Sequence, residues 1–481
     1  MNHENLQADA HQEMLDNGFQ PDFTPDMTAQ LVAIRTAAPI APGPAVKDLR
    51  ALLWSSIDND SSRDLDQIEY AEALPDGGVR VLVGIADVDG TVPKGSPIDV
   101  HAAAEGTSVY TGVTTFPMLP EELSTGLTSL NEAAGRASVI IEIAVGADGS
   151  IQTGQSYRAL VVNRAQLTYS ATGAWLEGTA AAPPKVAVSA ELQAQLKLQD
   201  DIAQKMRIAR YAAGALSIES IETTPTMAEG HVTGIQTMLK NRATELIEEF
   251  MIAANEVIAR QLASSGVASI RRVVKTPERW PRIVELAATF GEHLPAAPDS
   301  GALNAFLTKR RAADPVHAPD LSLAIVKLMG PGEYVVDRPG DAPQGHFGLA
   351  VHDYTHATAP NRRFADLVTQ RLIKSGARAY SADELDVIAR NCTLREDAAR
   401  KVERSMKKRI AAVALAPRVG ETFNAVVTGV TPKGTFVRVL EPPAEGRVMH
   451  GEQGMDVGDR VRVKLIDTDP RRGFIDFARA S

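Results

Sequence analysis

The sequence predicts an α+β protein of several domains: a mixed α/β central domain between a small N-terminal helical unit and a C-terminal five-stranded β-barrel. The chain has 481 residues, enough for about two to four domains with cores of their own. Its middle passes from short strand patterns to long amphipathic helical runs. Its last segment, 419–481, alternates short β-rich stretches with glycine and aspartate turns, the pattern of a small barrel.

The N-terminal unit covers residues 1–47 and resembles a helix-turn-helix. Apolar positions between Leu6 and Leu15 indicate one helix, and Gly18 stands where a C-cap would. Thr24 and Pro25 form an N-cap and first-turn proline that open a second helix. Acidic residues outnumber basic ones here, which disfavours DNA docking. We therefore expect a packing or interaction arm, followed by a linker rich in proline and glycine at 38–44.

Residues 48 to about 170 alternate strand patterns with turns, and residues 171–265 read as helical. The stretches 79–88 and 139–145 are rich in β-branched residues and predict strands. Amphipathic runs over 190–216 and 243–261 predict long helices. Glu248 and Glu249 interrupt the second run. They form either a solvated helix face or a contact with a polar site, because the residues around them are mostly apolar.

Composition bounds the class of protein. The chain has one cysteine, Cys392, which excludes an internal disulfide and fits a reducing compartment. The polar N-terminus lacks the apolar core of a secretory signal, and no apolar run has membrane-spanning length. We expect a cytoplasmic protein. The net charge of −10 does not indicate nucleic-acid binding, so a binder would need its basic residues gathered along a channel.

The most informative stretch is SSIDNDSSRDLDQIEY at 55–70, which holds Asp58, Asp60, Asp64 and Asp66. Carboxylates packed this closely repel one another, and a bound cation relieves the repulsion. Hard oxygen donors suit Mg²⁺ or Mn²⁺, and such clusters hydrolyse phosphodiesters in nucleases. The alternative is a solvated turn, since Asp, Asn and Ser also favour turns.

A second polar stretch lies at 346–373. Residues 360–363 resemble a helix start because proline favours the first turn, which places Arg362 where a helix N-terminus attracts anions. Arg362 can grip a phosphate, or it can pair with Asp366 at i,i+4. His356 is either a metal ligand or, more simply, a hydrogen-bonded structural histidine. The basic helix predicted over 383–413 is a solvated face or one wall of a channel.

The last segment suggests an OB fold, because five short strands follow one another in about sixty residues. Phe423 and Phe436 could form a stacking platform for single strands. Packing of one or both rings in the barrel core is the simpler alternative.

Four motifs between about Asp48 and Val413 resemble the ribonuclease II/RNB family of 3′→5′ exoribonucleases. They occur in family order as IDNDSSRDLDQ at 57–67, YTGVTTFPMLPEELS at 110–124, LIEEFMIAAN at 246–255 and HFGLAVHDYTHATAPNRRFADL at 346–367. The resemblance implies a helical unit at 1–47, a catalytic RNB domain at 48–415, and an RNA-binding OB domain at 419–481.

The resemblance also implies the roles of individual residues. Asp58, Asp64 and Asp66 match three of four aspartates that hold two Mg²⁺ ions, for which Mn²⁺ can substitute. In RNA binding, Tyr110 would stack on a base near the 3′ end and Tyr169 would lie beside the terminal nucleotides. Glu248 would read a ribose 2′-OH, Arg362 would hold the scissile phosphate, and Glu403 would line the site.

The chain departs from the family pattern in several places. Gln67 stands where the fourth aspartate is expected, which predicts a weaker second metal site. Ala359, Asn361, Phe364 and Gln370 are interpreted as packing changes. Forty-seven residues are too few for the family's two N-terminal cold-shock domains, so either RNA anchoring is weaker or the helical arm takes on part of it.

These features predict a hydrolytic exoribonuclease of the ribonuclease II type. Single-stranded RNA enters 3′ end first and is degraded to nucleoside 5′-monophosphates by two-metal catalysis. We expect RNA rather than DNA as the substrate, no membrane partner, and a monomer. The main rival is an RNA-binding protein whose catalytic domain is silenced, a reading that Gln67 motivates.

Overall fold

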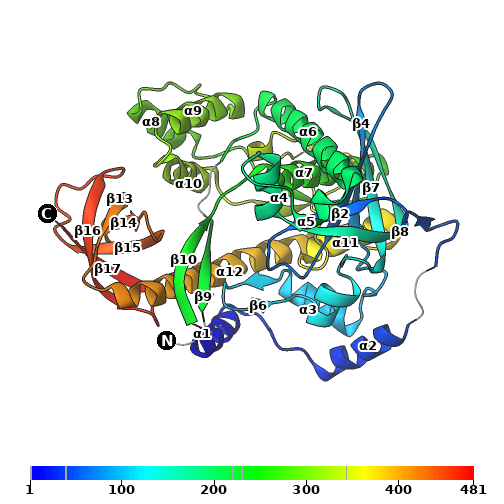
Figure 1. The fold of residues 1–481 in the computed structure, drawn as a ribbon, viewed down its shortest axis with the longest axis horizontal. Helices are drawn as coiled ribbons and strands as arrows, with labels where there is room; N and C mark the ends of the chain where they lie inside the picture. Colours follow the sequence, from blue (N-terminus) through cyan, green and yellow to red (C-terminus); the bar gives the residue numbers. More distant parts are fainter. Residues whose placement is uncertain (1–2, 38–40, 219–221, 229–230, 343, 481) are drawn as a thin grey trace.

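The computed structural model describes residues 3–37, 41–218, 222–228, 231–342 and 344–480. Residues 38–40, part of the predicted linker, lie outside them. A central body of sheet and helices is joined to a C-terminal barrel by one long helix, α12 (Figure 1). This architecture confirms the predicted fold class.

The central sheet has the strand order β1-β8-β2-β3-β4-β7. The 18-residue strand β8 pairs antiparallel with β7 through its first part and parallel with β2 through its last part. The sheet therefore curls around, and β8 joins both of its sides. The strands are β1 (Lys47–Asp48), β2 (Trp54–Asp58), β3 (Gln67–Ala73), β4 (Val79–Ala86), β7 (Gly135–Val145) and β8 (Ile151–Thr168).

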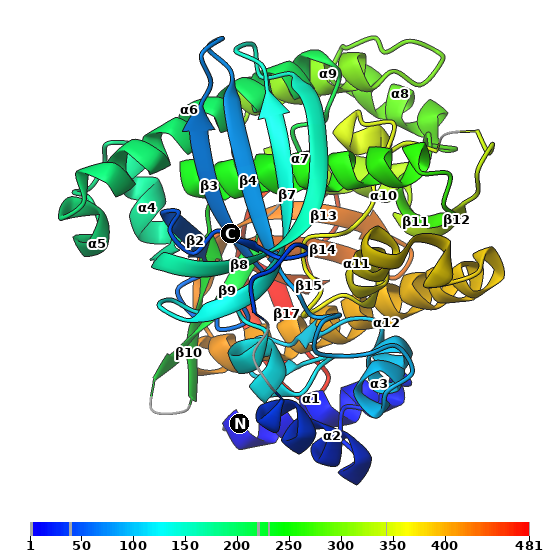
Figure 2. The same ribbon diagram turned by 90° about the vertical axis from the view of Figure 1, so that its right-hand side faces the viewer.

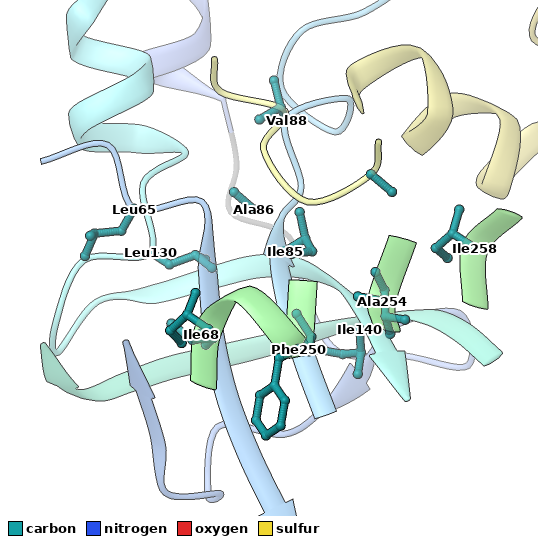
Figure 3. Packing of buried hydrophobic residues seen from close by; sticks show 14 of the residues in the cluster. Leu65, Ile68, Ile85, Ala86, Val88, Leu130, Ile140, Phe250, Ala254 and Ile258 are labelled. Carbon is teal, nitrogen blue, oxygen red and sulfur yellow. The ribbon is translucent and has the colours of Figure 1, made fainter. Parts of the chain in front are cut away.

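Two long helices cover the sheet: α6 (Ala190–Ala212) packs on β3, and α7 (Arg242–Ser264) crosses β4, β7 and β8 (Figure 2). A capping box between Asn241 and Thr244 fixes the start of α7. The shorter α4 (Tyr169–Leu176) and α5 (Pro184–Ala187) precede them. Figure 3 shows the resulting core, in which α7 contributes Phe250, Ala254 and Ile258, and the sheet contributes Ile68, Ile85 and Ile140.

The prediction that residues 171–265 are all helical is wrong in one place. Strands β9 (Glu222–Ala228) and β10 (His231–Met238) form an antiparallel hairpin between α6 and α7. Their threonines and β-branched residues favour strand over helix. Residues 219–221 and 229–230 lie outside the described part of the chain. The hairpin packs against α12.

A helical subdomain follows α7 between the paired strands β11 (Ser269–Val273) and β12 (Glu333–Asp337). It has its own core, built around Trp280, Phe306 and Ile325. Its helices are α8 (Trp280–Thr289), α9 (Ser300–Ala313) and α10 (Ala318–Met329). Helix α11 (Phe364–Ser375) then buries the predicted apolar face, and its first residue lies just after the start predicted at 360–363.

The N-terminal helices are α1 (His3–Asp16) and α2 (Pro25–Thr36), and Thr24 caps α2 as predicted. Helix α1 lies on α12, where Leu6 and Ala10 are buried, and α2 lies on α3 (Pro97–Glu105). The unit is therefore a packing arm. Two short strands, β5 (Val109–Tyr110) and β6 (Thr115–Phe116), lie close to it.

Helix α12 spans Ala382–Leu415 and leads into a closed barrel of order β13-β14-β15-β17-β16. Phe423 is 5% exposed and packs edge-on against Phe477 inside the barrel, so its proposed role in a stacking platform is wrong. Among the described aromatic residues of the barrel, the most exposed is Phe474, which sequence reasoning missed. The strands are β13 (Thr422–Thr431), β14 (Gly434–Val439), β15 (Ala444–His450), β16 (Arg460–Asp469) and β17 (Phe474–Arg479).

Among the described residues, each helix is too short or too polar to cross a membrane.

Candidate active site

The predicted acidic stretch forms the connection between two adjacent strands. Asp58 is the last residue of β2, and Gln67 is the first residue of β3. Asp58 is paired in register with Thr168 at the end of β8, so Tyr169, the first residue of α4, lies beside it. Strand pairing therefore brings together residues that are more than a hundred positions apart in sequence.

Asp66 is the most buried of the four aspartates in the acidic stretch, at 2% exposure. Its Oδ1 accepts a 2.9 Å hydrogen bond from the backbone N–H of Asn361, and its Oδ2 lies 3.5 Å from Nε of Arg362. Burial raises the pKa of Asp66 to about 7, although the Arg362 charge and the Asn361 hydrogen bond both act to lower it. The carboxylate is thus held between an arginine and a backbone amide.

Asp64 and Glu403 both bind Tyr110. The Tyr110 hydroxyl donates a 2.8 Å hydrogen bond to Oδ2 of Asp64, and the Tyr110 N–H donates one of 3.1 Å to Oε1 of Glu403 on α12. Burial raises the pKa of Glu403. Tyr110 as a residue is 40% exposed, and it lines the smaller of the two cavities described below.

Asp58 and Asp60 point to different partners. Oδ1 of Asp58 accepts hydrogen bonds from the Asn59 N–H, at 2.7 Å, and from the Ser62 hydroxyl, at 2.8 Å. Burial raises the pKa of Asp58, partly offset by those bonds. Asp60 instead accepts a 3.0 Å bond from the hydroxyl of Ser170, consistent with a residue outside the family pattern.

The sequence left open an ion pair between Arg362 and Asp366, and the structure does not show this pair. Arg363, not Arg362, pairs with Asp366, through contacts of 2.7 and 2.8 Å. The Arg362 side chain is 44% exposed and close to Asp66. Its backbone carbonyl accepts hydrogen bonds from Thr107 and Ser108. Arg362 therefore has a fixed backbone and a guanidinium that is free to meet a ligand.

Asn361, interpreted from the sequence as a packing change, contacts Asp66 through its backbone N–H alone. Its buried side chain accepts a 2.6 Å hydrogen bond from the hydroxyl of Thr128, which fits a packing role. Gln370 likewise bonds to the backbone of Ala86 and Asp89.

The predicted RNA-contacting residues Tyr169 and Glu248 are on α4 and α7. Tyr169 is half-buried, and burial together with the charges of Asp58 and Glu69 raises its pKa. Glu248 is 38% exposed and pairs with Lys240 at 2.9 Å. Glu249 is the buried member of the pair, and Arg210 neutralises it. Glu248 is thus the one available to a ligand.

The donor set fits a hard divalent cation. Asp58, Asp64, Asp66 and Gln67 offer only oxygen ligands on one connection, and the buried Oδ2 of Asp66 has no hydrogen-bond donor. In the described conformation each aspartate binds a protein donor, and no three acidic, histidine or cysteine side chains of the described residues converge on one point. An ion would have to replace some of these contacts. His356 is buried and bonds to Tyr334 at 2.7 Å, which makes it structural.

A large open cavity of about 1350 Å³ lies between the helical subdomain, α12 and the barrel. A smaller one of about 240 Å³ adjoins it and ends at Tyr110 and Glu403. The two share the lining residues Thr223, Ile235 and Lys407, so they lie side by side. Tyr110 in turn bonds to Asp64 of the acidic loop. The basic residues along the larger cavity are Arg282, Lys327, Arg404, Lys407, Lys408 and Arg438.

Some of this basic lining is already neutralised. Arg438 of the barrel forms a two-pronged ion pair with Asp320 of α10, at 2.7 and 3.0 Å. Arg404, Lys407 and Lys408 of α12 also line the cavity. Part of the basic face of α12 therefore lines a cavity, together with the acidic residues Glu285, Asp320 and Glu445.

Comparisons with known proteins agree with this arrangement. A family model described as "RNB domain" matches residues 46–378, and one described as "RNase II-type exonuclease C-terminal S1 domain" matches residues 421–480. Ribonuclease R of Escherichia coli is 30% identical over 475 residues, covering 90% of this chain and 57% of that protein. Ribonuclease R of Thermotoga maritima is 30% identical over 471 residues, covering 90% and 64%. The chain spans about half to two thirds of the length of these curated relatives.

Solved structures share the fold. The apo form of Mycoplasma genitalium RNase R matches with a TM-score of 0.85 at 23% identity, over 99% of this chain and 78% of that one. Yeast Ssd1, a pseudonuclease, matches with a TM-score of 0.70 at 15% identity, over 95% and 57%. Because a pseudonuclease has the same fold, the fold alone does not decide between catalysis and binding.

Proposed function

The chain belongs to the RNB family, and we propose that it is a hydrolytic exoribonuclease that degrades single-stranded RNA from the 3′ end to nucleoside 5′-monophosphates. We place its catalytic domain at residues 48–415 and its RNA-binding OB domain at 419–481, with 1–47 as a packing arm. The proposal rests on one observation above all. Asp66 lies beside Arg362, and Asp64 of the same loop bonds to Tyr110, which lines the smaller cavity.

The channel accounts for the substrate class. A basic path meets an RNA backbone without reading its sequence, and an exposed aromatic ring stacks on any base. Tyr110 lines the smaller cavity and would stack on a base near the 3′ end, and Tyr169 would lie beside the terminal nucleotides. Glu248 is the exposed glutamate of α7 and would accept a hydrogen bond from a ribose 2′-OH, which selects RNA over DNA.

The acidic loop accounts for the chemistry. Asp58, Asp64 and Asp66, with Gln67 as a weaker neutral donor, would hold Mg²⁺ or Mn²⁺. Bound divalent ions supply activation of a water molecule and stabilisation of the leaving oxygen in this reaction class. Arg362 extends toward the same point with an exposed guanidinium. It would neutralise charge that develops on the scissile phosphate. Glu403 fixes Tyr110 through its backbone N–H.

The alternative is an RNA-binding protein with a silenced RNB domain, favoured by Gln67 and by the shared fold of a pseudonuclease. The retained aspartates and Arg362 support catalysis instead. The test is Mg²⁺-dependent release of nucleoside monophosphates from a uniformly labelled RNA, with DNA of the same sequence in parallel. We expect release from RNA only. Binding of RNA without release of any nucleotide, with Mg²⁺ or with Mn²⁺, would establish the alternative.

A further inference from the structure

A further carboxylate, that of Glu69, lies two residues beyond Gln67 and outside the aspartate motif. Glu69 is in β3, opposite Ser55 of β2, and its exposure is 0%. Neither of its carboxylate oxygens has a hydrogen-bond partner, and the buried hydroxyl of Ser55 has none either. Buried carboxylates of this kind are rare because the charged form loses its hydration without compensation.

Glu69 is located on the same side of the strand as Gln67. Successive side chains of a strand alternate between faces, so residues two apart share one face. Strand β3 pairs with β4 without irregularity from Gln67 to Ala73, which keeps this alternation intact. The glutamate side chain is one methylene longer than aspartate. It can therefore extend from its own position toward the end of the strand where Gln67 begins.

Glu69 also lies close to the proposed metal ligands in the sheet. Its pairing partner Ser55 is three residues before Asp58, the last residue of β2. Gln67, which begins β3, is two residues before Glu69. The two carboxylates therefore share one low-dielectric neighbourhood in which their negative charges repel. A divalent cation removes the repulsion and supplies the missing partner for Glu69 at the same time.

We propose that Glu69 provides, toward the divalent ion held beside Asp58, the negative charge that Gln67 lacks. The inference rests on the proposed function, because it concerns the metal site of that reaction. It assigns the fourth acidic contribution to Glu69, the next residue of β3 whose side chain lies on the same face as that of Gln67. It also explains why a fully buried glutamate without protein partners occurs at this point of the core.

The proposal is tested by measuring metal binding without RNA. The metal-free full-length chain is titrated with Mn²⁺, followed by calorimetry and by the electron paramagnetic resonance signal of free Mn²⁺. Glu69→Gln keeps the size of the side chain and removes its charge. We expect Mn²⁺ affinity at the weaker site to fall at least about 10-fold, the lower end of what loss of even an outer partner of a metal site costs.

A charge transfer and a matched control make the result specific. The double variant Gln67→Asp with Glu69→Gln returns the charge to the motif and should restore Mn²⁺ affinity. Glu105→Gln is the control, because Glu105 is also buried, at 4% exposure, but accepts a hydrogen bond from the Gln20 N–H away from the acidic loop. It should bind Mn²⁺ like the wild type. Heat denaturation without metal verifies that each variant is folded.

The outcomes distinguish the role of Glu69 from the metal dependence of the proposed nuclease. Equal Mn²⁺ affinity of Glu69→Gln and wild type would overturn the role of Glu69 and leave the proposed nuclease intact. A wild-type chain that binds no Mn²⁺ would overturn the metal-dependent function itself. If Glu69→Gln does not fold, Gln67→Asp alone decides. Little gain in Mn²⁺ affinity is expected when Glu69 already supplies the charge, and a gain of 10-fold or more would contradict the proposal.

Discussion

The hydroxyl of Tyr110 donates a 2.8 Å hydrogen bond to the carboxylate of Asp64. This bond connects a ring that lines the smaller cavity to a residue of the acidic loop. The same tyrosine is fixed through its N–H by Glu403 of α12. The proposed function therefore assigns binding of the strand end and contact with a hydrolytic residue to one side chain, and substitutions can separate the two.

Tyr110→Ala should lengthen the shortest product that the enzyme releases. Each stacked base contributes about 1–3 kcal/mol, so a strand that loses one stack dissociates while it is longer. Product length on a sequencing gel measures the effect. Tyr110→Phe keeps the ring and loses only the bond to Asp64, so its shortest product should match that of the wild type. Equal products from wild type and Tyr110→Ala would make Tyr110 structural.

Asp66→Asn should abolish hydrolysis while RNA affinity stays close to that of the wild type. The amide oxygen still accepts the bond from Asn361, whereas the negative charge is lost. Nucleotide release and fluorescence anisotropy measure the two properties. Asp60→Asn is the matched control, because Asp60 belongs to the same loop but bonds to Ser170, and its activity should be normal. Persistent hydrolysis by Asp66→Asn would refute its assignment as a metal ligand.

Arg362→Ala should lower turnover by about 10²–10³, the usual loss for one charge-stabilising donor, with a small change in RNA affinity. Single-turnover rates and binding constants provide the comparison. Arg363→Ala should behave differently. It leaves the buried Asp366 unpaired, which costs about 3–5 kcal/mol of folding free energy, so it should lower the urea midpoint. A mainly weakened affinity in Arg362→Ala would place this residue in general backbone binding.

Lys407→Ala should weaken RNA binding and reduce its dependence on salt. Lys407 lines both cavities of the channel, and one neutralised phosphate of a single strand contributes about 0.7 to the slope of log affinity against log salt. Lys401→Ala, an exposed residue of the same helix that lines neither cavity, serves as control. If the two variants have equal slopes, RNA follows a different path.

Acid should destabilise the fold through His346. Burial lowers its pKa to about 4, from 6.5, so the unfolded chain binds a proton between these values that the folded chain does not. Its stabilising contribution is complete above pH 6.5 and is lost as the pH falls toward 4. Urea midpoints at pH 7 and pH 5 should therefore differ more for wild type than for His346→Asn, which retains an acceptor for the Leu349 N–H.

The exposed His450 of the barrel provides the control for this titration. His450→Asn should show the same loss of stability between pH 7 and pH 5 as the wild type. If His346→Asn also shows the full wild-type loss, the pH dependence arises elsewhere, for example at the fully buried His356, whose pKa burial also lowers.

Sequence patterns predicted the elements whose residues carry strong local signals. The cap at Thr24, the amphipathic runs of α6 and α7, and the barrel strands all follow from period and turn chemistry. The hairpin β9–β10 was missed because a polar, threonine-rich segment has no strong period. Tertiary packing on α12 decides its conformation.

Within the candidate site, the motifs identified the residues but not their contacts. Arg362 and Arg363 are adjacent and chemically identical in the sequence, and only the fold shows which of them meets Asp366. The sequence did not indicate a role for Glu69, because a single acidic residue in a strand is usually interpreted as solvent-facing. Its burial becomes visible only when β2, β4 and the helices enclose it.

Helix α12 sets the distance between the barrel and the contact that Glu403 makes with Tyr110. From Glu403, which binds Tyr110, to Leu415 at its end, the helix advances about 18 Å at 1.5 Å per residue. This span is one uninterrupted helix, so it sets the separation between the barrel and the acidic loop. Under the proposed function, an RNA shorter than the span would contact one of these two regions only, and the last stages of degradation would proceed without the barrel.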